Sequence, residues 1–566
     1  MNNHDLLIER IQRELSRQLQ GRWSQISLTT NAPTRNMAAS CIAVWKIDFT
    51  DGDIVYPNVN FVYVGIDKQF PRTQPKLWIP GYVHGKSKPW PHIDNNGTLC
   101  LPRSSMNHEP EHRIIQHLAW AQTLLNMDPV TRRKDFMREA AAYWAQSHTN
   151  LENVYSLLSL KPESRVIAYA GNRREFFVAD TPQELAKYLM HLKSTKQSAT
   201  IYQGYLVWLN RPWCPHEFPD FANQLLTLIP VGVQDQILVA GRDCLVLIAA
   251  NSENGVIFFS AFIKSKKLAD VRKGFRSGSV LPASVVRSAF FGFRIHKMDV
   301  SRVDGAWVHG RDHDPNYKNL YSKRVVVCGC GSLGASIARL LAQAGVGTLH
   351  LIDRDKMSSH NASRHLLGVG DTGTNKVSSL RTLLLTDFPH MKEVTAHCKF
   401  IEDMSHDELD IIRHADVIVS AGITIAGDLF LDEWRRTNSL HSIHVCAWTE
   451  AFAVAGHSVA LFDNDTISDI FDENTEVKFR LCDVPLEAGH MVAMAGCGDT
   501  FQPHGVIELQ PTINISARVV IDALTGKISN SIRRTWFGSR HEAERLKLVP
   551  RDTFDNELCI KDFAFE

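Results

Sequence analysis

The sequence lacks long apolar runs and carries almost no net charge. Its 62 Lys and Arg residues balance 61 Asp and Glu residues, which leaves a formal charge of +1. Without a strong global field, neither nucleic acid nor an anionic membrane is expected as a direct partner. No apolar stretch approaches the ~18–20 residues of a membrane-spanning helix, and the first residues resemble an amphipathic polar helix rather than a signal peptide. A soluble, cytoplasmic protein is therefore expected.

Closely spaced cysteine pairs of the Cys-x-x-Cys type are also missing from the sequence. The eleven cysteines are odd in number, are scattered along the chain and include no Cys-x-x-Cys motif. This pattern argues against a disulfide framework and against the usual paired-cysteine zinc site, and it favours free thiols in a reducing compartment. With 566 residues, 44% hydrophobic residues and 22% charged residues, the chain has the composition of an ordinary globular protein. At ~150 residues each, three or four domains are expected.

Hydrophobic patterning divides the chain into three regions: 1–155, 156–300 and 301–566. The first region has helical patterns at its beginning and at its end, with β-rich runs between them, which predicts an α+β domain. The second carries no motif and is expected to be a mixed α/β domain of unknown fold. Strand-like runs in this second region occur at 205–209, 237–240, 244–250 and 256–263. The third is expected to be a Rossmann-like α/β domain with a mixed, largely parallel sheet.

A glycine-rich turn marks a candidate nucleotide site in the third region. Gly329-x-Gly331-x-x-Gly334 lies between a β-rich run and an Ala/Leu-rich helix, and a second strand is predicted at 348–352. In such a βαβ unit, glycines let the backbone approach phosphates closely, while the helix presents its unpaired N–H groups. Asp353 ends the second strand, where an acid can bind ribose hydroxyls. The alternative is that the glycines only permit close packing of the helix on the sheet.

Three further polar residues favour an adenylating enzyme over a nicotinamide dehydrogenase. Asn361, Arg364 and Lys376 follow the ribose acid in the segment HNASRHLLGVGDTGTNKV. Two cations here would stabilise negative charge while the α-phosphorus of a nucleoside triphosphate is attacked and pyrophosphate leaves. A hydride-transfer cofactor has no such need, so this pattern favours ATP.

With these residues, the segment from about 300 to 530 resembles the ThiF/MoeB-like ubiquitin-activating superfamily, whose members adenylate the C-terminal carboxylate of a small protein. The resemblance implies that Asp353 binds the ribose and that Asn361, Arg364 and Lys376 surround the phosphates of ATP. It also implies a Mg²⁺ ligand after the next strand. Ser420 and Ile423 stand where acids are often found, which leaves Asp428 as the expected magnesium ligand.

The same superfamily is commonly dimeric, and an arginine before the first strand of one subunit completes the site of the other. The resemblance therefore implies a homodimer. Arg302 and Arg311 are the two candidates in this sequence, and the alternative is that both are ordinary surface arginines.

The N-terminal segment WPHIDNNGTLCLP resembles the active-site turn of ubiquitin-conjugating enzymes, and the likeness covers about residues 1–150. In that family a His-Pro-Asn turn precedes the catalytic cysteine, which places Cys100 as a thioester carrier. The alternative is a buried structural cysteine. His92 stands in place of the family's Asn, where an imidazole could donate a hydrogen bond or relay a proton, or could simply form the turn.

A second acyl-accepting thiol is expected in the C-terminal region. Cys497 lies in the glycine-flanked segment MAGCGDTFQPHG, where an exposed backbone suits a thiol that a loop brings to the adenylate. Cys482 is the alternative, and a third possibility is that this half has no catalytic cysteine. The sequence context of Cys328, Cys330, Cys398 and Cys446 predicts structural roles.

A conjugating-like domain and an activating-like domain on one chain resemble the CD-NTase-associated protein 2 family, which are bacterial fusions from antiphage CBASS operons. This resemblance implies adenylation and thioester capture of the C-terminus of a cGAS-like nucleotidyltransferase and its attachment to an amine of a target protein. Two alternatives are a sulfur-carrier adenylyltransferase, which needs only the C-terminal half, and a non-catalytic scaffold that binds the nucleotidyltransferase.

Overall fold

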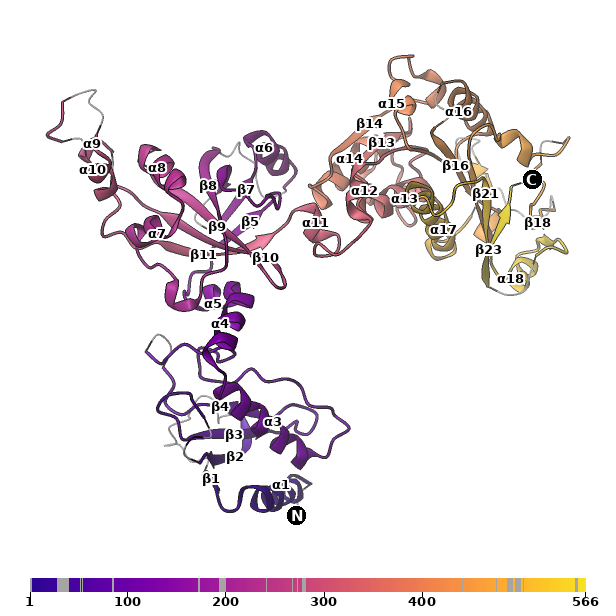
Figure 1. Cartoon of the computed structure of the whole chain (residues 1–566). Helices are drawn as coiled ribbons and strands as arrows, with labels where there is room; N and C mark the ends of the chain where they lie inside the picture. Colours follow the sequence, from indigo (N-terminus) through magenta and orange to yellow (C-terminus); the bar gives the residue numbers. More distant parts are fainter. Residues whose placement is uncertain are drawn as a thin grey trace. The chain divides into compact units, whose positions relative to one another are not determined.

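The computed structural model describes residues 3–27, 40–50, 52, 54–83, 86–171, 174–192, 200–240, 242–266, 268–271, 273–276, 281–438, 441–474, 476–485, 492–493, 500–501, 503–554 and 558–565. Two compact units make up the chain: the first contains Met1–Val154, Leu160–Phe176 and Tyr202–Ser301, and the second contains Tyr155–Ser159, Phe177–Ile201 and Arg302–Glu566. The predicted mixed α/β and α+β multidomain class is confirmed (Figure 1). Within the described ranges, no helix has both the length and the apolarity that a membrane span requires.

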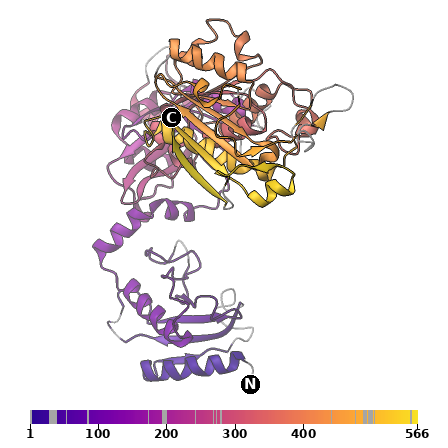
Figure 2. The same cartoon turned by 90° about the vertical axis from the view of Figure 1, so that its right-hand side faces the viewer.

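The N-terminal part of the first unit is an α+β fold, as predicted. Its antiparallel sheet has the order β1-β2-β3-β4. The strands are β1 (Trp23–Gln25), β2 (Cys41–Asp48), β3 (Phe61–Asp67) and β4 (Lys76–Trp78), and the helices are α1 (Asn3–Leu19), α3 (Pro110–Leu125), α4 (Pro129–Arg138) and α5 (Ala140–Gln146). Helix α1 lies against this sheet in both views (Figures 1 and 2). Ile11 and Leu15 of α1 share a buried core with Ile114 and Leu118 of α3, so the apolar stripe of each helix holds it on the sheet.

A closed barrel follows, with the strand order β10-β11-β5-β7-β6-β8-β9. Its strands are β5 (Asn153–Ser156), β6 (Arg165–Gly171), β7 (Glu175–Ala179), β8 (Tyr202–Leu209), β9 (Cys244–Ser252), β10 (Gly255–Ile263) and β11 (His296–Arg302). Helices α6 (Pro182–His191), α7 (Ala222–Leu228), α8 (Val231–Ala240), α9 (Leu268–Val271) and α10 (Ala283–Ser288) connect them.

One predicted strand of this region is wrong. The apolar run 237–240 forms the last turn of α8 instead. Val233 and Ile237, one helical turn apart, are both buried in the barrel core, so the period of the pattern is helical. A four-residue apolar run does not by itself distinguish a buried strand from a helix.

The second unit contains an eight-stranded sheet with the order β14-β13-β12-β15-β16-β17-β21-β23. Its strands are β12 (Arg324–Cys328), β13 (Thr348–Ile352), β14 (Glu393–His397), β15 (Val417–Ala421), β16 (Ile443–Thr449), β17 (Ala455–Leu461), β21 (Ile532–Phe537) and β23 (Cys559–Ala564). Strands β12 to β16 pair in parallel, and β17, β21 and β23 are antiparallel, so the predicted mixed, largely parallel sheet is confirmed.

Helices cover both faces of this sheet. They are α11 (Gly305–Val308), α12 (Tyr317–Ser322), α13 (Ser332–Gln343), α14 (Lys376–Asp387), α15 (Asp410–Arg413), α16 (Ile425–Asn438), α17 (Val506–Leu524) and α18 (Arg540–Arg545). Two short pairs lie outside the sheet: β18 (Cys482–Asp483) with β22 (Val549–Pro550), and β19 (Val492–Ala493) with β20 (Thr500–Phe501). Val325 and Val327 of β12 pack with α13, α14 and α17, whereas Val326 and Cys328 pack with α16. Both faces of β12 are therefore buried, which explains its continuous apolar run.

The strand order places a topological switch at β12. The chain leaves β12 toward β13 and β14 on one side, and β15 and β16 lie on its other side. In open parallel sheets of this kind, ligands bind beyond the carboxyl ends of the strands at the switch point. The glycine turn at 329–334 lies at that position.

Candidate active site

The glycine turn links β12 to α13. Gly329 has φ of +81°, and a side chain on it would collide with the backbone of Ala421. A side chain on Gly334 would overlap the carbonyl oxygen of Gly329, whereas the Cβ position of Gly331 faces open space. The turn therefore needs glycine for its own folding at two positions, and at the third it leaves the start of α13 open to a ligand.

Asp353 and His365 hold this turn in place. The backbone N–H of Cys330 donates to Asp353 Oδ2 at 2.8 Å, and the N–H of Asp355 donates to Oδ1 at 2.7 Å. His365 donates from Nε2 to the Cys330 carbonyl at 2.8 Å and accepts the N–H of Leu367 at Nδ1. Burial lowers the pKa of His365, which agrees with the neutral ring that these two bonds require. The sequence analysis missed His365.

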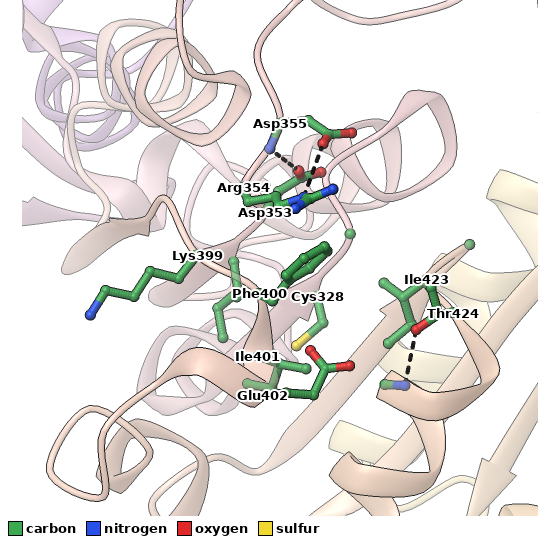
Figure 3. Close-up of a pocket in the computed structure, with 14 residues that line it drawn as sticks. Cys328, Asp353, Arg354, Asp355, Lys399, Phe400, Ile401, Glu402, Ile423 and Thr424 are labelled. Carbon is green, nitrogen blue, oxygen red and sulfur yellow. Dashed lines mark hydrogen bonds and ion pairs between the residues drawn. The ribbon is translucent and has the colours of Figure 1, made fainter. Parts of the chain in front are cut away.

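A pocket of about 400 Å³ opens beside the turn, at the carboxyl ends of the parallel strands (Figure 3). Its lining residues are Cys328, Gly329, Ile352, Asp353, Arg354, Asp355, Lys399, Phe400, Ile401, Glu402, Gly422, Ile423, Thr424 and Gly427. The Arg354 guanidinium lies 3.7 Å from the centre of the Phe400 ring, and this ring remains 40% exposed. An exposed aromatic face in a pocket is suited to stacking on a planar base. Sequence reasoning missed Phe400 and Glu402, although their place just after β14 was a usable signal.

The predicted phosphate ligands lie beyond this lining. Lys376, at the start of α14, is 8% exposed, and its ammonium is 2.9 Å from Asp355 Oδ2. Arg364 donates to Asn361 Oδ1 at 3.1 Å, so these two predicted residues are in direct contact. Asp355 lines the pocket and thereby connects the Lys376 ammonium to it. The roles of Asn361, Arg364 and Lys376 toward phosphate stay predictions.

The expected magnesium ligand, Asp428, is not among the described residues that line the pocket. Its Oδ1 lies 4.0 Å from His444 Nε2, inside the second unit. Three other carboxylates line the pocket, those of Asp353, Asp355 and Glu402, and Figure 3 shows that of Glu402 directed toward the Cys328 thiol. Asp428 lies away from the pocket because α16 starts at Ile425, which places Asp428 in the first turn of this helix, against β16.

The two arginine candidates differ in their environment. The Arg302 guanidinium binds Asp304 at 2.8 Å and Asp312 at 2.5 Å, and its side chain is 5% exposed. It is therefore fully engaged within its own chain. Arg311 is exposed.

Cys100 is an exposed thiol at the edge of a second pocket of about 760 Å³. Other residues of this lining include His92, Leu101, Pro102, Trp120, Asn126, Met127, Asp128 and Glu139. The structure thus places the predicted Cys100 and His92 in one cavity, and Cys100 is not the buried structural cysteine of the alternative.

His92 lies in the turn that the sequence singles out, with φ of +58°. Its backbone N–H donates to the Tyr143 hydroxyl at 2.9 Å. Its Nε2 is 3.4 Å from Asp135 and its Nδ1 is 3.4 Å from Glu139, so a carboxylate faces each ring nitrogen. Burial raises the pKa of Tyr143 well above its usual range, so the phenol remains a neutral acceptor for this turn.

Cys497 lies outside the described residues, and its role stays a prediction. Cys482, the alternative, is buried, and burial followed by the nearby Glu450 raises the pKa of its thiol to about 12. A neutral buried thiol is a poor nucleophile. Of the cysteines predicted to be structural, Cys398 is exposed at the end of β14 and is not held in a core. The other three, Cys328, Cys330 and Cys446, are buried.

Glu450 anchors the start of the segment that leads toward Cys497. Its Oε1 accepts the N–H of Leu481 at 2.6 Å and its Oε2 accepts the N–H of Cys482 at 2.9 Å. His457 Nε2 also lies 2.9 Å from Oε1, and its Nδ1 lies 3.0 Å from the Thr535 hydroxyl. The carboxylate thus ties the chain at 481–482 to β17 and β21.

The C-terminal part of the chain matches a known protein family. Residues 309–522 match the model of the ThiF family, which confirms the resemblance seen in the glycine turn and the following polar residues. The chain is similar to proteins named "ATP-dependent ubiquitin transferase-like protein Cap2". It is 25% identical over 256 residues to one from Pseudomonas aeruginosa, covering 44% of each chain, and 26% identical over 144 residues to one from Vibrio cholerae, covering 25% of this chain and 24% of the relative. These alignments span less than half the length of the relatives.

Solved structures give weaker likenesses. A structure titled "Crystal structure of E. coli MccB + AMPCPP + SeMeT MccA" is 18% identical, with a TM-score of 0.29, and covers 44% of this chain and 65% of that chain. A structure titled "Crystal Structure of SeMet PaaA" is 14% identical, with a TM-score of 0.32, and covers 46% of this chain and 79% of that chain.

Proposed function

We propose that this chain adenylates the C-terminal carboxylate of a protein with ATP and conjugates that protein to an amine through cysteine thioesters, since residues 309–522 match the model of the ThiF family. The observation that carries the proposal is the presence of two different sites on one chain. One is the glycine-turn pocket with Asp353 at the carboxyl ends of the strands, and the other is the exposed thiol of Cys100 in a pocket of its own.

Each step of this reaction is a displacement. A substrate carboxylate oxygen attacks the α-phosphorus of ATP, so that an acyl adenylate forms and pyrophosphate leaves. The Cys497 thiolate then attacks the acyl carbon and releases AMP. Transfer to the Cys100 thiolate regenerates Cys497, and an acceptor amine finally displaces Cys100 to give an amide. The last step is favourable because a thiolate leaves more readily than an amide nitrogen.

The residues present fit ATP. The Cβ position of Gly331 is open at the start of α13, Asp353 lines the pocket, and Lys376 and Arg364 supply positive charge beyond it. Mg²⁺ would neutralise phosphate charge, with Glu402 as the pocket's carboxylate on the β14 side. Of Glu402 and Asp428, only Glu402 is among the residues that line the pocket, and we therefore favour Glu402 for this role.

The substrate and setting are part of the proposal. The resemblance of the two-domain sequence implies a cGAS-like nucleotidyltransferase as the protein whose C-terminus is activated, an acceptor amine on a target protein, and a role in antiphage CBASS signalling in the cytoplasm. The likeness to proteins named ubiquitin transferase-like supports a protein as the substrate. We further propose that two copies of this chain form a homodimer. Arg311 is the better candidate to enter the partner's site, since Arg302 is engaged by two aspartates.

A sulfur-carrier adenylyltransferase is the second candidate, favoured by a relative named "Adenylyltransferase and sulfurtransferase MOCS3" from Drosophila grimshawi, 31% identical over 115 residues. That alignment covers 20% of this chain and 25% of the relative. The exposed Cys100 in its own pocket favours conjugation instead, because a sulfur carrier needs no such N-terminal site.

Exchange of labelled pyrophosphate into ATP tests the proposal. With the full chain, exchange should depend on a protein substrate that has a free C-terminal carboxylate, and a substrate with an amidated C-terminus serves as the matched control. Absence of exchange with every carboxylate substrate, together with amide conjugates that form without ATP, would contradict adenylation. Absence of both activities would favour a non-catalytic scaffold.

A further inference from the structure

A cluster of three metal-ligand side chains lies between α16 and β16. Asp428 stands in the first turn of α16, and His444 and Cys446 stand two residues apart on β16, so their side chains share one face of the sheet. One ligand atom from each of the three lies within 4.8 Å of those of the other two. His444 is 0% exposed and Cys446 is 1% exposed. The cluster is thus a mixed oxygen, nitrogen and sulfur donor set in which His444 and Cys446 are buried and Asp428 is partly buried.

The Asp428 carboxylate lacks a partner for one of its oxygens. Oδ1 is buried and makes no hydrogen bond within the described part of the chain, and it lies 4.0 Å from His444 Nε2. A buried carboxylate oxygen without a donor costs free energy, and a cation between Oδ1 and its neighbours would remove that cost.

A second carboxylate, that of Asp432, lies near the other nitrogen of the His444 ring. Nε2 lies 3.4 Å from Cys446 Sγ and 3.0 Å from the Ser420 hydroxyl, while Nδ1 lies 3.9 Å from Asp432 Oδ1. Asp432 in turn binds Arg435 at 3.0 Å. A carboxylate behind the outer ring nitrogen is the usual support of a metal-bound histidine.

We propose that Asp428, His444 and Cys446 bind a divalent transition-metal ion of the zinc type. Imidazole and thiolate are donors that zinc and its neighbours prefer, whereas Mg²⁺ prefers six oxygens. On binding, the S–H bond of Cys446 breaks, its proton passes to solvent, and sulfur bonds to the metal. Three protein ligands leave a fourth position for the Ser420 hydroxyl or water.

The metal has a structural consequence for the neighbouring nucleotide pocket. Gly427, the residue before Asp428, lines that pocket, as does Thr424, just before the start of α16. A metal between α16 and β16 would fix this wall by direct bonds. The inference is independent of the proposed function, because it rests only on the donor atoms and their burial.

Cobalt is a suitable probe, because Co²⁺ replaces zinc and its bond to a thiolate produces a charge-transfer band in the near ultraviolet. The full chain, produced in cobalt-supplemented medium, should carry about one ion per chain and show this band. Cys446→Ser should abolish the band. Asp428→Asn keeps the side-chain volume and should lower the affinity for the metal by more than the ~10–100-fold that is typical of outer-shell changes. Its metal content should therefore be lower than that of the wild type. Cys398→Ser, which removes an exposed thiol, is the control that should change nothing.

Two results would overturn the site. One is a folded wild-type chain that holds less than ~0.1 ion per chain after growth with cobalt or with zinc. The other is equal metal content in wild type and in Asp428→Asn. If Cys446→Ser does not fold, the Asp428→Asn comparison still decides, with far-ultraviolet circular dichroism confirming its fold. Pyrophosphate exchange is not needed as a readout, so failure of the proposed function and failure of this site remain distinguishable.

Discussion

The backbone N–H of Cys100 donates a hydrogen bond to the carbonyl oxygen of His92 at 2.7 Å. This bond closes the turn on which both residues stand, and the neighbouring pair Ile93 and Leu99 continues it as an antiparallel bridge. The two side chains also line one pocket, so the imidazole and the thiol face the same cavity. The turn thus holds the Cys100 thiol at the surface, outside the hydrophobic core.

Removing a cation of the phosphate site should slow adenylation without unfolding the domain. Arg364→Ala or Lys376→Ala should each cost about 2.7–4 kcal/mol of transition-state stabilisation, or ~10²-fold or more in pyrophosphate exchange. Arg339→Ala is the matched control, because Arg339 pairs with Asp387 at 2.8 Å, lies over the Phe388 ring and does not line the pocket. Unchanged exchange in both site variants would refute the assignment.

Loss of the exposed ring in the nucleotide pocket should weaken ATP binding more than it slows the chemical step. Phe400→Ala removes a stacking face worth about 1–3 kcal/mol, so KM for ATP should rise roughly 5- to 150-fold while kcat changes little. Phe400→Tyr, which keeps the ring, should restore the affinity. Steady-state exchange at varied ATP concentration measures both constants. A fall in kcat at unchanged KM would show that the ring does not contact the nucleotide.

The relay of the acyl group predicts distinct trapped species. Cys497→Ala should retain pyrophosphate exchange and lose thioesters, whereas Cys482→Ala should retain both, because the buried Cys482 thiol has a pKa of about 12. Cys100→Ser should accumulate an oxygen ester that survives thiol reductant and is cleaved by hydroxylamine. Denaturing gels with and without reductant distinguish these adducts. Wild-type conjugation by Cys100→Ala would make the N-terminal domain a docking module only.

The anchor at Glu450 should affect thioester formation more than adenylation. Glu450→Ala leaves the N–H groups of Leu481 and Cys482 without their acceptor, at about 1–3 kcal/mol for each buried donor. The melting temperature should fall by several degrees. In the variant that remains folded, transfer to Cys497 should fall further than pyrophosphate exchange does. Equal loss of thioester transfer and of pyrophosphate exchange would show that Glu450 only stabilises the fold.

A pair of histidines should make the second unit sensitive to acid. His309 Nε2 and His390 Nε2 are 2.6 Å apart, a bond that needs one neutral acceptor. Burial, followed by His309, lowers the pKa of His390 to about 4. Because the native state binds its proton only below this value, stability is fully present above pH ~6.5 and is lost as pH falls toward 4, by on the order of 3 kcal/mol.

Urea unfolding of the full chain between pH 4 and 7 measures this loss. His390→Phe removes the titrating group and should flatten the stability profile over that window. A profile for His390→Phe that still falls in parallel with wild type would exclude the histidine pair as its cause.

The sequence by itself determined the backbone of the glycine turn. Gly329 and Gly334 are required by local backbone conformation and close contact, and Asp353 ends a strand whose apolar run is unambiguous. These are short-range constraints that a strand, turn and helix pattern records directly. The Cys100 turn was predicted from the resemblance of the segment WPHIDNNGTLCLP to a known active-site turn, and the structure adds the Asp94 hydrogen bonds and the positive φ of Gly97 that form it.

Only the tertiary structure decided which distant residues share a pocket. Phe400 and Glu402 join Asp353 because parallel strands end at one edge of the sheet, and strand order is not visible in a linear pattern. Asp428 faces β16 rather than the pocket because the starting residue of α16 sets the direction of its side chain, and a shift of one residue turns a helix by about 100°. The sequence therefore specified local backbone chemistry, while the packing of helix on sheet specified which side chains can act together.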